Sequence, residues 1–188
     1  MAMETLAEER LITYSDYREL DTDDCLWYEL LHGELVKKSA PSPRHQSASM
    51  NLSSLMHTFA KQHQLGAVYC APIDVFVDEY NAPQPDILFI ANANKHIVTH
   101  DGIMGAPDLV VEILSPSSIG YDRGMKQRLY QRLGVQEYWI LDPKNSSIEV
   151  YRLVEGMYDL ASFAVERGTV DSIALPGFVV EVGDIFEE

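Results

Sequence analysis

The sequence has few cysteines and no long hydrophobic run. Its two cysteines, Cys25 and Cys70, are too few for a disulfide framework and lack metal-ligand spacing, so we expect two free, at least partly buried thiols. No apolar stretch approaches the roughly 20 residues that a membrane-spanning helix needs. The first residues, MAMETLAEER, lack the pattern of a signal peptide. These absences predict a soluble protein with no membrane partner and a cytoplasmic location.

Basic residues are also scarce, with 14 Lys and Arg against 29 Asp and Glu, which gives a formal net charge of −15. A nucleic-acid partner is at first sight disfavoured, because phosphate binding requires Lys and Arg. The acids are concentrated at the ends, however: residues 1–29 hold nine acids and two bases, and residues 155–188 hold eight acids and one base. The middle, 30–154, has twelve acids and eleven bases and does not exclude such a partner.

Several motifs that would define a function class are absent. There is no internal repeat, no low-complexity segment and no glycine-rich loop of the kind that cradles phosphates. Ser115, Ser117 and Ser118 lack the Gly-x-Ser-x-Gly context of a hydrolase nucleophile. A chain of 188 residues with 46% hydrophobic residues and no dividing linker is expected to form one domain, 1–188.

The hydrophobic pattern alternates between helix and strand periods. A long amphipathic helix is expected after SAPSPRHQ, to about residue 64, and a second helix over 122–133, ending at Gly134. A short helix capped by Thr13 or Ser15 and a hairpin over 26–38, turning near His32-Gly33, precede them. Strands are predicted at 67–77, 87–91, 108–114 and 137–141, then in the runs IEVYRL, MYDLASFAV, DSIAL and GFVVEV. This order predicts an α/β fold with a mixed sheet, an N-terminal hairpin and a β-rich C-terminal part.

The most apolar part of the chain contains an ionisable residue. Glu112 interrupts the apolar strand 108–114, and Asp86 stands at the start of the strand 87–91. A buried carboxylate costs several kcal/mol unless it is paired, protonated or bound to a cation. Asp108 shares a face with Glu112 but lies about 13 Å from it along the strand, too far to bind the same ion. Asp86 and Glu112 are therefore the candidate pair.

If these two strands are neighbours, Asp86 approaches Glu112 across about 5 Å. The backbone carbonyl of Ile113 could then add a third oxygen ligand. Carboxylate and carbonyl oxygens suit a hard cation, so the pattern indicates a site for Mg²⁺ or Mn²⁺ and not for zinc.

The helix after Glu112 has a lysine where its apolar stripe predicts a hydrophobic residue. Stepping back three residues from Leu129, or four from Tyr130, leads to Lys126. Its stem can pack against the core while its ammonium reaches a buried carboxylate. The alternative is a lysine at the sheet edge, paired with Asp122 four residues earlier. Beside two buried acids we favour a site role for Lys126, with Tyr130 and Asp122 close to it.

Glu34 and His45 carry weaker signals. Glu34 follows the hairpin turn, where a solvated glutamate is the simpler interpretation and an outer metal ligand or water-positioning acid is the functional one. His45 falls on the apolar stripe of the long helix, one heptad before Leu52. A core or helix-end histidine is the simpler interpretation there, and a contact with the site is the alternative.

These elements resemble the PD-(D/E)XK nuclease superfamily and, more closely, its bacterial putative restriction endonuclease family, long catalogued as a domain of unknown function. The matching landmarks are GELV around Glu34, SPRH ending at His45, PQPD ending at Asp86, APDLVVEILSPSS around Glu112, DRGMKQRLY from Asp122 to Tyr130 and GVQEYWILDP. They cover about 12–182, which the resemblance implies to be the core. It further implies a restriction-endonuclease-like mixed sheet flanked by helices.

The resemblance also implies roles for site residues. Asp86 and Glu112 would hold the divalent metal, and Glu34 would be the additional acid. The superfamily usually places its lysine two residues after the glutamate, where this chain has Leu114. Lys126 would then be a migrated replacement that approaches the same point from the helix.

We therefore predict a Mg²⁺- or Mn²⁺-dependent endonuclease that hydrolyses DNA phosphodiester bonds. Its catalytic residues would be Asp86, Glu112, Lys126 and Glu34. Because one site cuts one strand, cleavage of a duplex favours a homodimer. Two other functions stay open: an interaction module that keeps the fold without cleavage, which the acidity favours, and a metal-dependent hydrolase of a small phosphoester. The sequence identifies no target sequence and no number of metal ions.

Overall fold

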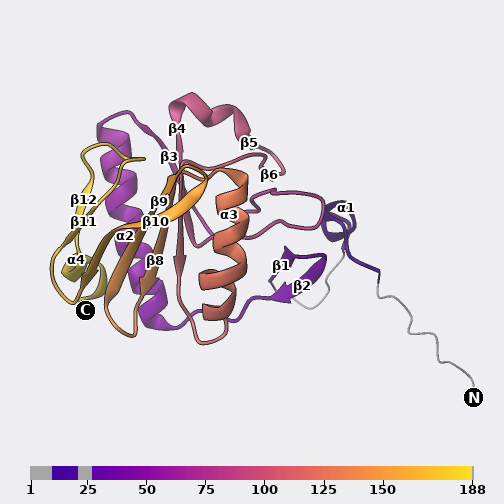
Figure 1. The fold of residues 1–188 in the computed structure, drawn as a ribbon, viewed down its shortest axis with the longest axis horizontal. Helices are drawn as coiled ribbons and strands as arrows, with labels where there is room; N and C mark the ends of the chain where they lie inside the picture. Colours follow the sequence, from indigo (N-terminus) through magenta and orange to yellow (C-terminus); the bar gives the residue numbers. More distant parts are fainter. Residues whose placement is uncertain (1–9, 21–26, 188) are drawn as a thin grey trace, which may run out of the picture.

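A six-stranded mixed sheet forms the centre of the computed structural model, which describes residues 10–20 and 27–187. The strand order is β10-β9-β8-β7-β4-β3 (Figure 1). The strands are β3 (Gly66–Cys70), β4 (Ile87–Ala91), β7 (Leu109–Ile113), β8 (Glu137–Asp142), β9 (Ser147–Val154) and β10 (Met157–Val165). Within this sheet β7 and β8 are parallel and the other neighbours antiparallel, so the predicted mixed sheet is confirmed.

Helices cover both faces of the sheet. They are α2 (Pro43–Gln62) on one face, and a continuous segment of π-helix η2 (Tyr121–Lys126) and α3 (Gln127–Leu133) on the other (Figure 1). Leu52 of α2 belongs to the same core cluster as Val111, whereas Tyr130 of α3 belongs to the cluster that contains Val110. Alternate residues of β7 therefore point to opposite faces, as the strand period predicts.

The helix boundaries follow from local chemistry. Ser42 caps α2 by accepting a hydrogen bond from the His45 N–H, and Pro43 occupies the first turn, where its missing N–H costs nothing. The helix α3 ends at Gly134, which has a φ of 92°, as predicted for a left-handed residue after the last turn.

The N-terminal hairpin is also confirmed, although its predicted start at Leu26 lies outside the described residues. It follows α1 (Tyr14–Arg18), which Thr13 caps, and consists of β1 (Tyr28–Leu31) and β2 (Glu34–Lys37). His32 and Gly33 form the turn with φ values of 53° and 75°, which suit a two-residue hairpin. Leu30 and Ala82 exchange backbone hydrogen bonds of 3.3 and 2.8 Å, which dock the hairpin onto the loop before β4.

The remaining elements are η1 (Asn92–Ile97), β5 (Val98–Thr99), β6 (Gly102–Ile103), β11 (Thr169–Asp171), β12 (Val179–Glu181) and α4 (Val182–Phe186). Two predicted strands are too long. The strand 67–77 ends at Cys70, just before Pro72, which has no N–H to donate to a sheet. The run DSIAL leaves the strand after Asp171, because the N–H groups of residues 173 and 174 donate to the buried carboxylate of Glu137.

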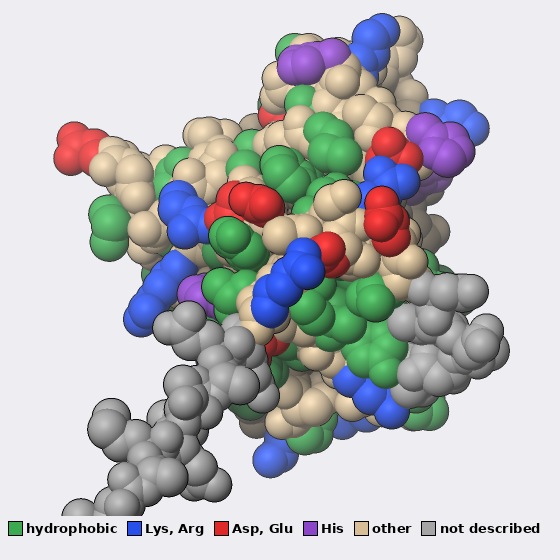
Figure 2. Space-filling model, turned by 90° about the vertical axis from the view of Figure 1, so that its right-hand side faces the viewer, with side chains coloured by type: hydrophobic (Ala, Val, Ile, Leu, Met, Phe, Trp, Pro, Cys, Tyr) green, Lys and Arg blue, Asp and Glu red, His purple; other side chains and the backbone are tan. Residues whose placement is uncertain are grey.

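The surface is mixed in character. On the face shown in Figure 2, basic, acidic and hydrophobic side chains are interspersed.

Cys70 is exposed, so the prediction of an at least partly buried thiol is wrong there, and Cys25 lies outside the described residues. Within residues 10–20 and 27–187, no helix is both long and apolar enough to cross a membrane.

Candidate active site

Asp86 and Glu112 lie side by side on neighbouring strands. β4 and β7 are antiparallel with Ile87 opposite Val111, so the register places Asp86 next to Glu112. The Asp86 Oδ2 accepts a hydrogen bond of 2.7 Å from the N–H of Ile113. Glu112 alternates with Val111 and therefore faces η2 and α3, where it is 1% exposed. The structure thus brings together the two acids that the sequence pairs.

Lys126 lies among three carboxylates. Its Nζ is 2.9 Å from Glu29 Oε2, 3.2 Å from Glu112 Oε1 and 3.5 Å from Asp122 Oδ1. Asp122 and Lys126 both belong to η2, and a π-helix is wound more loosely than an α-helix, so residues four apart stay nearly in line. Lys126 therefore contacts a buried acid, as favoured, and also pairs with Asp122. It does so at 1% exposure, so the alternative of a lysine at the sheet edge is wrong.

Two further side chains fix the paired acids. The Tyr130 hydroxyl donates a hydrogen bond of 2.8 Å to Glu112 Oε1. His45, in the first turn of α2, places its Nε2 3.4 Å from Asp86 Oδ2. Its Nδ1 is buried and finds no hydrogen-bond partner in the described part of the chain. Both residues thus contact the paired acids, and for His45 this is the alternative interpretation, a contact with the site.

Glu29 is the member of the cluster that the sequence interpretation missed. It lies on β1, is 4% exposed, and accepts a hydrogen bond of 3.0 Å from the Gln84 N–H in addition to its ion pair with Lys126. The signal was present, since Glu29 interrupts the apolar run CLWYELL as Glu112 interrupts its strand. The criterion applied to Glu112 therefore identifies Glu29 as well.

Glu34 is not brought to this cluster. It is exposed at the start of β2, directly after the hairpin turn and opposite Leu31. Two strand positions and the turn separate it from Glu29, whose side chain faces the interior. The solvated interpretation fits its surroundings, and any role as the additional acid stays a prediction.

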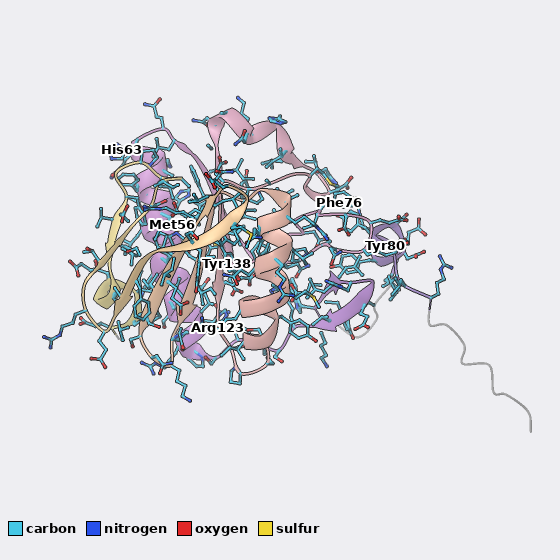
Figure 3. All side chains as sticks on the ribbon, in the orientation of Figure 1. Met56, His63, Phe76, Tyr80, Arg123 and Tyr138 are labelled. Carbon is cyan, nitrogen blue, oxygen red and sulfur yellow. The ribbon has the colours of Figure 1, made fainter. Side chains whose placement is uncertain are left out.

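The clustered residues line one cleft of about 880 Å³. Its walls also contain Lys37 and Lys38, and Lys38 Nζ donates a hydrogen bond of 2.6 Å to the Gln84 carbonyl. Arg123, labelled with Tyr138 in Figure 3, forms two hydrogen bonds of 2.9 and 2.5 Å with the Glu149 carboxylate. Besides His45, the basic side chains of the cleft wall are therefore lysines.

Burial and neighbouring positive charge shift the pKa values of the acids in opposite directions. Desolvation raises the pKa of Glu112 well above its ordinary value, and it also raises the pKa of Asp122. Burial would raise the pKa of Asp86 as well, but the hydrogen bond from His45 and the charge of Lys38 lower it overall. Asp86 is thus held as an anion, while ionised Glu112 and Asp122 are costly unless a cation is close.

Burial and the neighbouring charges also shift the pKa of Lys126. Burial would lower the pKa of Lys126, but the charges of Glu112, Glu29 and Asp122 outweigh burial and raise it. The ammonium is therefore present at neutral pH. Burial raises the pKa of Tyr130 too, so its hydroxyl stays a hydrogen-bond donor.

The donor set fits a divalent metal. Four carboxylates, those of Glu29, Asp86, Glu112 and Asp122, line the cleft together with one buried ammonium, and neither oxygen of Asp122 has a hydrogen-bond partner among the described residues. In the same part of the chain, no three His, Cys, Asp or Glu side chains converge as a complete metal cage. Mg²⁺ commonly uses one or two carboxylates and completes its shell with water and phosphate oxygens, so Asp86 and Glu112 suit it.

The mixed sheet between helices, with acids at the ends of its middle strands, defines the chain as a restriction-endonuclease-like α/β protein. It belongs to the Uma2 family, described as putative restriction endonuclease, whose model matches residues 14–183. The predicted fold class and family are confirmed.

Two proteins and one solved structure are similar to most of the chain. The chain is 24% identical over 154 residues to the uncharacterized protein sll1609 of Synechocystis, covering 81% of this chain and 86% of that protein. It is 29% identical over 161 residues to the uncharacterized protein slr1290 of the same organism, covering 82% of each. The crystal structure of a putative nuclease belonging to DUF820 from Anabaena variabilis has a TM-score of 0.75 at 18% identity, covering 93% of this chain and 97% of that one. That likeness shows the fold.

Proposed function

We propose that the chain is a divalent-metal-dependent endonuclease that hydrolyses DNA phosphodiester bonds. The observation that carries this proposal is the Lys126 ammonium, 2.9 and 3.2 Å from Glu29 and Glu112, in a cleft that also contains Asp86. The proposal is also supported by membership of a family described as putative restriction endonuclease and by carboxylates of the type that hold metal ions beside the buried ammonium.

Asp86 and Glu112, with the carbonyl of Ile113, are the residues that would hold Mg²⁺ or Mn²⁺. The bound ion would supply Lewis-acid activation of the phosphate and a lower pKa for an attacking water. Asp86 suits this role because its pKa is lowered, so it is ionised before any metal binds. Tyr130 and His45 hold the two carboxylates in place through their contacts with them.

Lys126 supplies a fixed positive charge to the same cleft. Its ammonium would orient the attacking water and stabilise negative charge that develops on the phosphoryl oxygens. Glu29 pairs with the lysine over 2.9 Å and would act as the additional acid instead of Glu34. Lys37 and Lys38, on the cleft wall, are available for flanking phosphates. Cleavage of both strands would favour a homodimer, since each chain contributes one such cleft.

The proposal is tested by cleavage of plasmid and single-stranded DNA with Mg²⁺ or Mn²⁺. Asp86→Asn and Lys126→Gln should each lose at least about 100-fold in rate, because each removes a charge that acts on the transition state. Asp159→Asn is the matched control, since Asp159 is exposed on β10 and outside the cleft, and it should retain wild-type activity.

A second readout follows the metal alone. Titration with Mn²⁺, followed by electron paramagnetic resonance, should show binding that Asp86→Asn weakens and Asp159→Asn does not. Equal background cleavage in all proteins, together with normal Mn²⁺ binding, would instead favour a fold that has lost cleavage, the function that the net charge of −15 supports. Cleavage of a small phosphodiester without cleavage of DNA would identify a small-phosphoester hydrolase.

A further inference from the structure

Gln84 touches two charged residues of the cleft through its backbone. Its N–H donates a hydrogen bond of 3.0 Å to Glu29 Oε2, and its carbonyl accepts one of 2.6 Å from Lys38 Nζ. It stands between Pro83 and Pro85 in the sequence PQPD, two residues before Asp86. Proline has no N–H, so Gln84 has the only backbone donor in residues 83–85. The two peptide groups on either side of the Gln84 Cα therefore contact Glu29 and Lys38, respectively.

The side chain of Gln84 is fixed outside the cleft. Its Nε2 donates hydrogen bonds of 2.9 Å to Asp74 Oδ1 and 3.2 Å to the Tyr17 hydroxyl. That hydroxyl lies 2.9 Å from the Tyr28 carbonyl, next to Glu29 in β1. Tyr17 and Asp74 line a separate cavity of about 330 Å³, and Gln84 lines both this cavity and the cleft. Gln84 is 7% exposed, so its amide is desolvated and its hydrogen bonds are correspondingly costly to lose.

We propose that Gln84 is a positioning residue for the cleft. Its side-chain amide, held by Asp74 and Tyr17, fixes the backbone of residue 84, whose N–H orients Glu29 and whose carbonyl orients Lys38. Through Glu29 it sets the position of the Lys126 ammonium. Gln84 needs no contact with substrate for this role. The positioning rests on the hydrogen bonds above, and only its kinetic consequence rests on the proposed nuclease function.

A donor–acceptor exchange tests the proposal. Gln84→Glu places a carboxylate against Asp74 and removes the amide donor, so the anchor breaks. Combining Asp74→Asn with Gln84→Glu reverses donor and acceptor, keeps the net charge of the wild type and restores one hydrogen bond. Asp74→Asn alone is the mild control, because its amide oxygen still accepts from Gln84. Gln84→Met removes the donors without adding charge and replaces Gln84→Glu if that variant does not fold.

The first readout is hydrogen exchange of the amide at position 84, which donates to Glu29 and does not depend on catalysis. Protection should fall at least about tenfold in Gln84→Glu and Gln84→Met, and recover in the double variant. The second readout is cleavage: kcat should fall at least about tenfold with KM for DNA within about twofold, and the double variant should recover most of the loss.

The outcomes separate the two proposals. Unchanged protection in Gln84→Glu and Gln84→Met, or no recovery in the double variant, would overturn the positioning role. The expected exchange pattern in a protein that cleaves no DNA would support the anchor and reject the nuclease. Parallel losses of kcat and folding stability with unchanged exchange at position 84 would show a general structural effect and overturn the positioning role as well.

Discussion

At the level of single residues, the hairpin contains two glutamates in opposite surroundings. Glu29 is 4% exposed and pairs with Lys126 over 2.9 Å, whereas Glu34 is exposed beside the turn. We predict that Glu29→Gln lowers the rate of DNA cleavage at least about tenfold, because the lysine loses a partner that fixes it. Glu34→Gln should stay within about twofold of the wild type. Initial rates of plasmid nicking measure both, and a loss confined to Glu34→Gln would restore Glu34 as the additional acid.

Asp122 is a residue whose charge costs stability. It is 1% exposed, and burial raises its pKa above the ordinary value of 3.8, with the charge of Lys126 compensating only in part. A folded-state pKa above the unfolded one means that the folded protein binds the proton more tightly. The free energy of unfolding therefore falls as pH rises from 3.8 through the folded pKa.

Asp122→Asn should remove this pH-dependent fall in the free energy of unfolding, since an amide does not ionise. We expect the variant to exceed the wild type in free energy of unfolding by more than about 0.5 kcal/mol at neutral pH, beyond the usual range of surface changes. The gain should vanish at low pH, where the wild-type carboxyl is also protonated. Urea denaturation across the pH range measures the difference, with exposed Asp159→Asn as control. A gain that does not depend on pH would contradict the electrostatic explanation.

At the level of elements, a side chain should be tolerated at one glycine of a helix and not at one glycine of a turn. A Cβ on Gly124, in η2, would meet no atom within 4 Å, so Gly124→Ala should stabilise the protein by about 0.5–1 kcal/mol through helix propensity. Gly33, in the hairpin turn, has a φ of +75°, and a Cβ there would lie 2.8 Å from the Leu11 Cβ. Gly33→Ala should therefore destabilise by more than about 1 kcal/mol. Thermal unfolding should show a higher Tm for Gly124→Ala and a lower Tm for Gly33→Ala. A shift of both Tm values in the same direction would contradict the surroundings described for one of the two glycines.

The strands and helices that carry Asp86, Glu112 and Lys126 could be predicted because their patterns are local. Period-two alternation in β7 identifies the face of Glu112, and the apolar stripe of α3 identifies an inward position at Lys126. Both depend only on residues within a few positions, which the sequence supplies directly. That β4 and β7 are neighbours was only a condition at the level of the sequence, and the structure meets it.

The place of the hairpin could not be predicted in the same way. Glu29 reaches Lys126 because Leu30 and Ala82 bond across the loop before β4, residues more than fifty positions apart in the chain. A buried glutamate in β1 is visible as an interrupted apolar run, but its partner depends on this long-range docking. The resemblance points to Glu34, within the landmark GELV, and Glu29 is not among the predicted site residues. The loop from 71 to 86 was likewise predicted in part as strand, although it fixes the cleft through Gln84.

At the level of the whole molecule, charge should make DNA binding depend on a divalent cation. The net charge is −15, and the cleft contains four carboxylates and one buried ammonium, so phosphates are repelled unless a cation is bound. We predict that Ca²⁺, which takes the same oxygen ligands as Mg²⁺, tightens binding of a labelled duplex at least about tenfold over chelator. Fluorescence anisotropy measures the affinity, and gels of the same samples verify that the duplex is intact.

Screening by added salt must be separated from ion binding in the cleft. A NaCl control at matched ionic strength should lower DNA affinity, because salt weakens phosphate contacts by competition with Lys and Arg. The combined Asp86→Asn and Glu112→Gln variant removes two negative charges from the cleft, so it should bind DNA more tightly than the wild type in chelator and gain little from Ca²⁺. A Ca²⁺ effect of equal size in both proteins would place the cation elsewhere on the acidic surface. Tight binding by the wild type in chelator would show that the basic side chains of the middle region suffice without a metal.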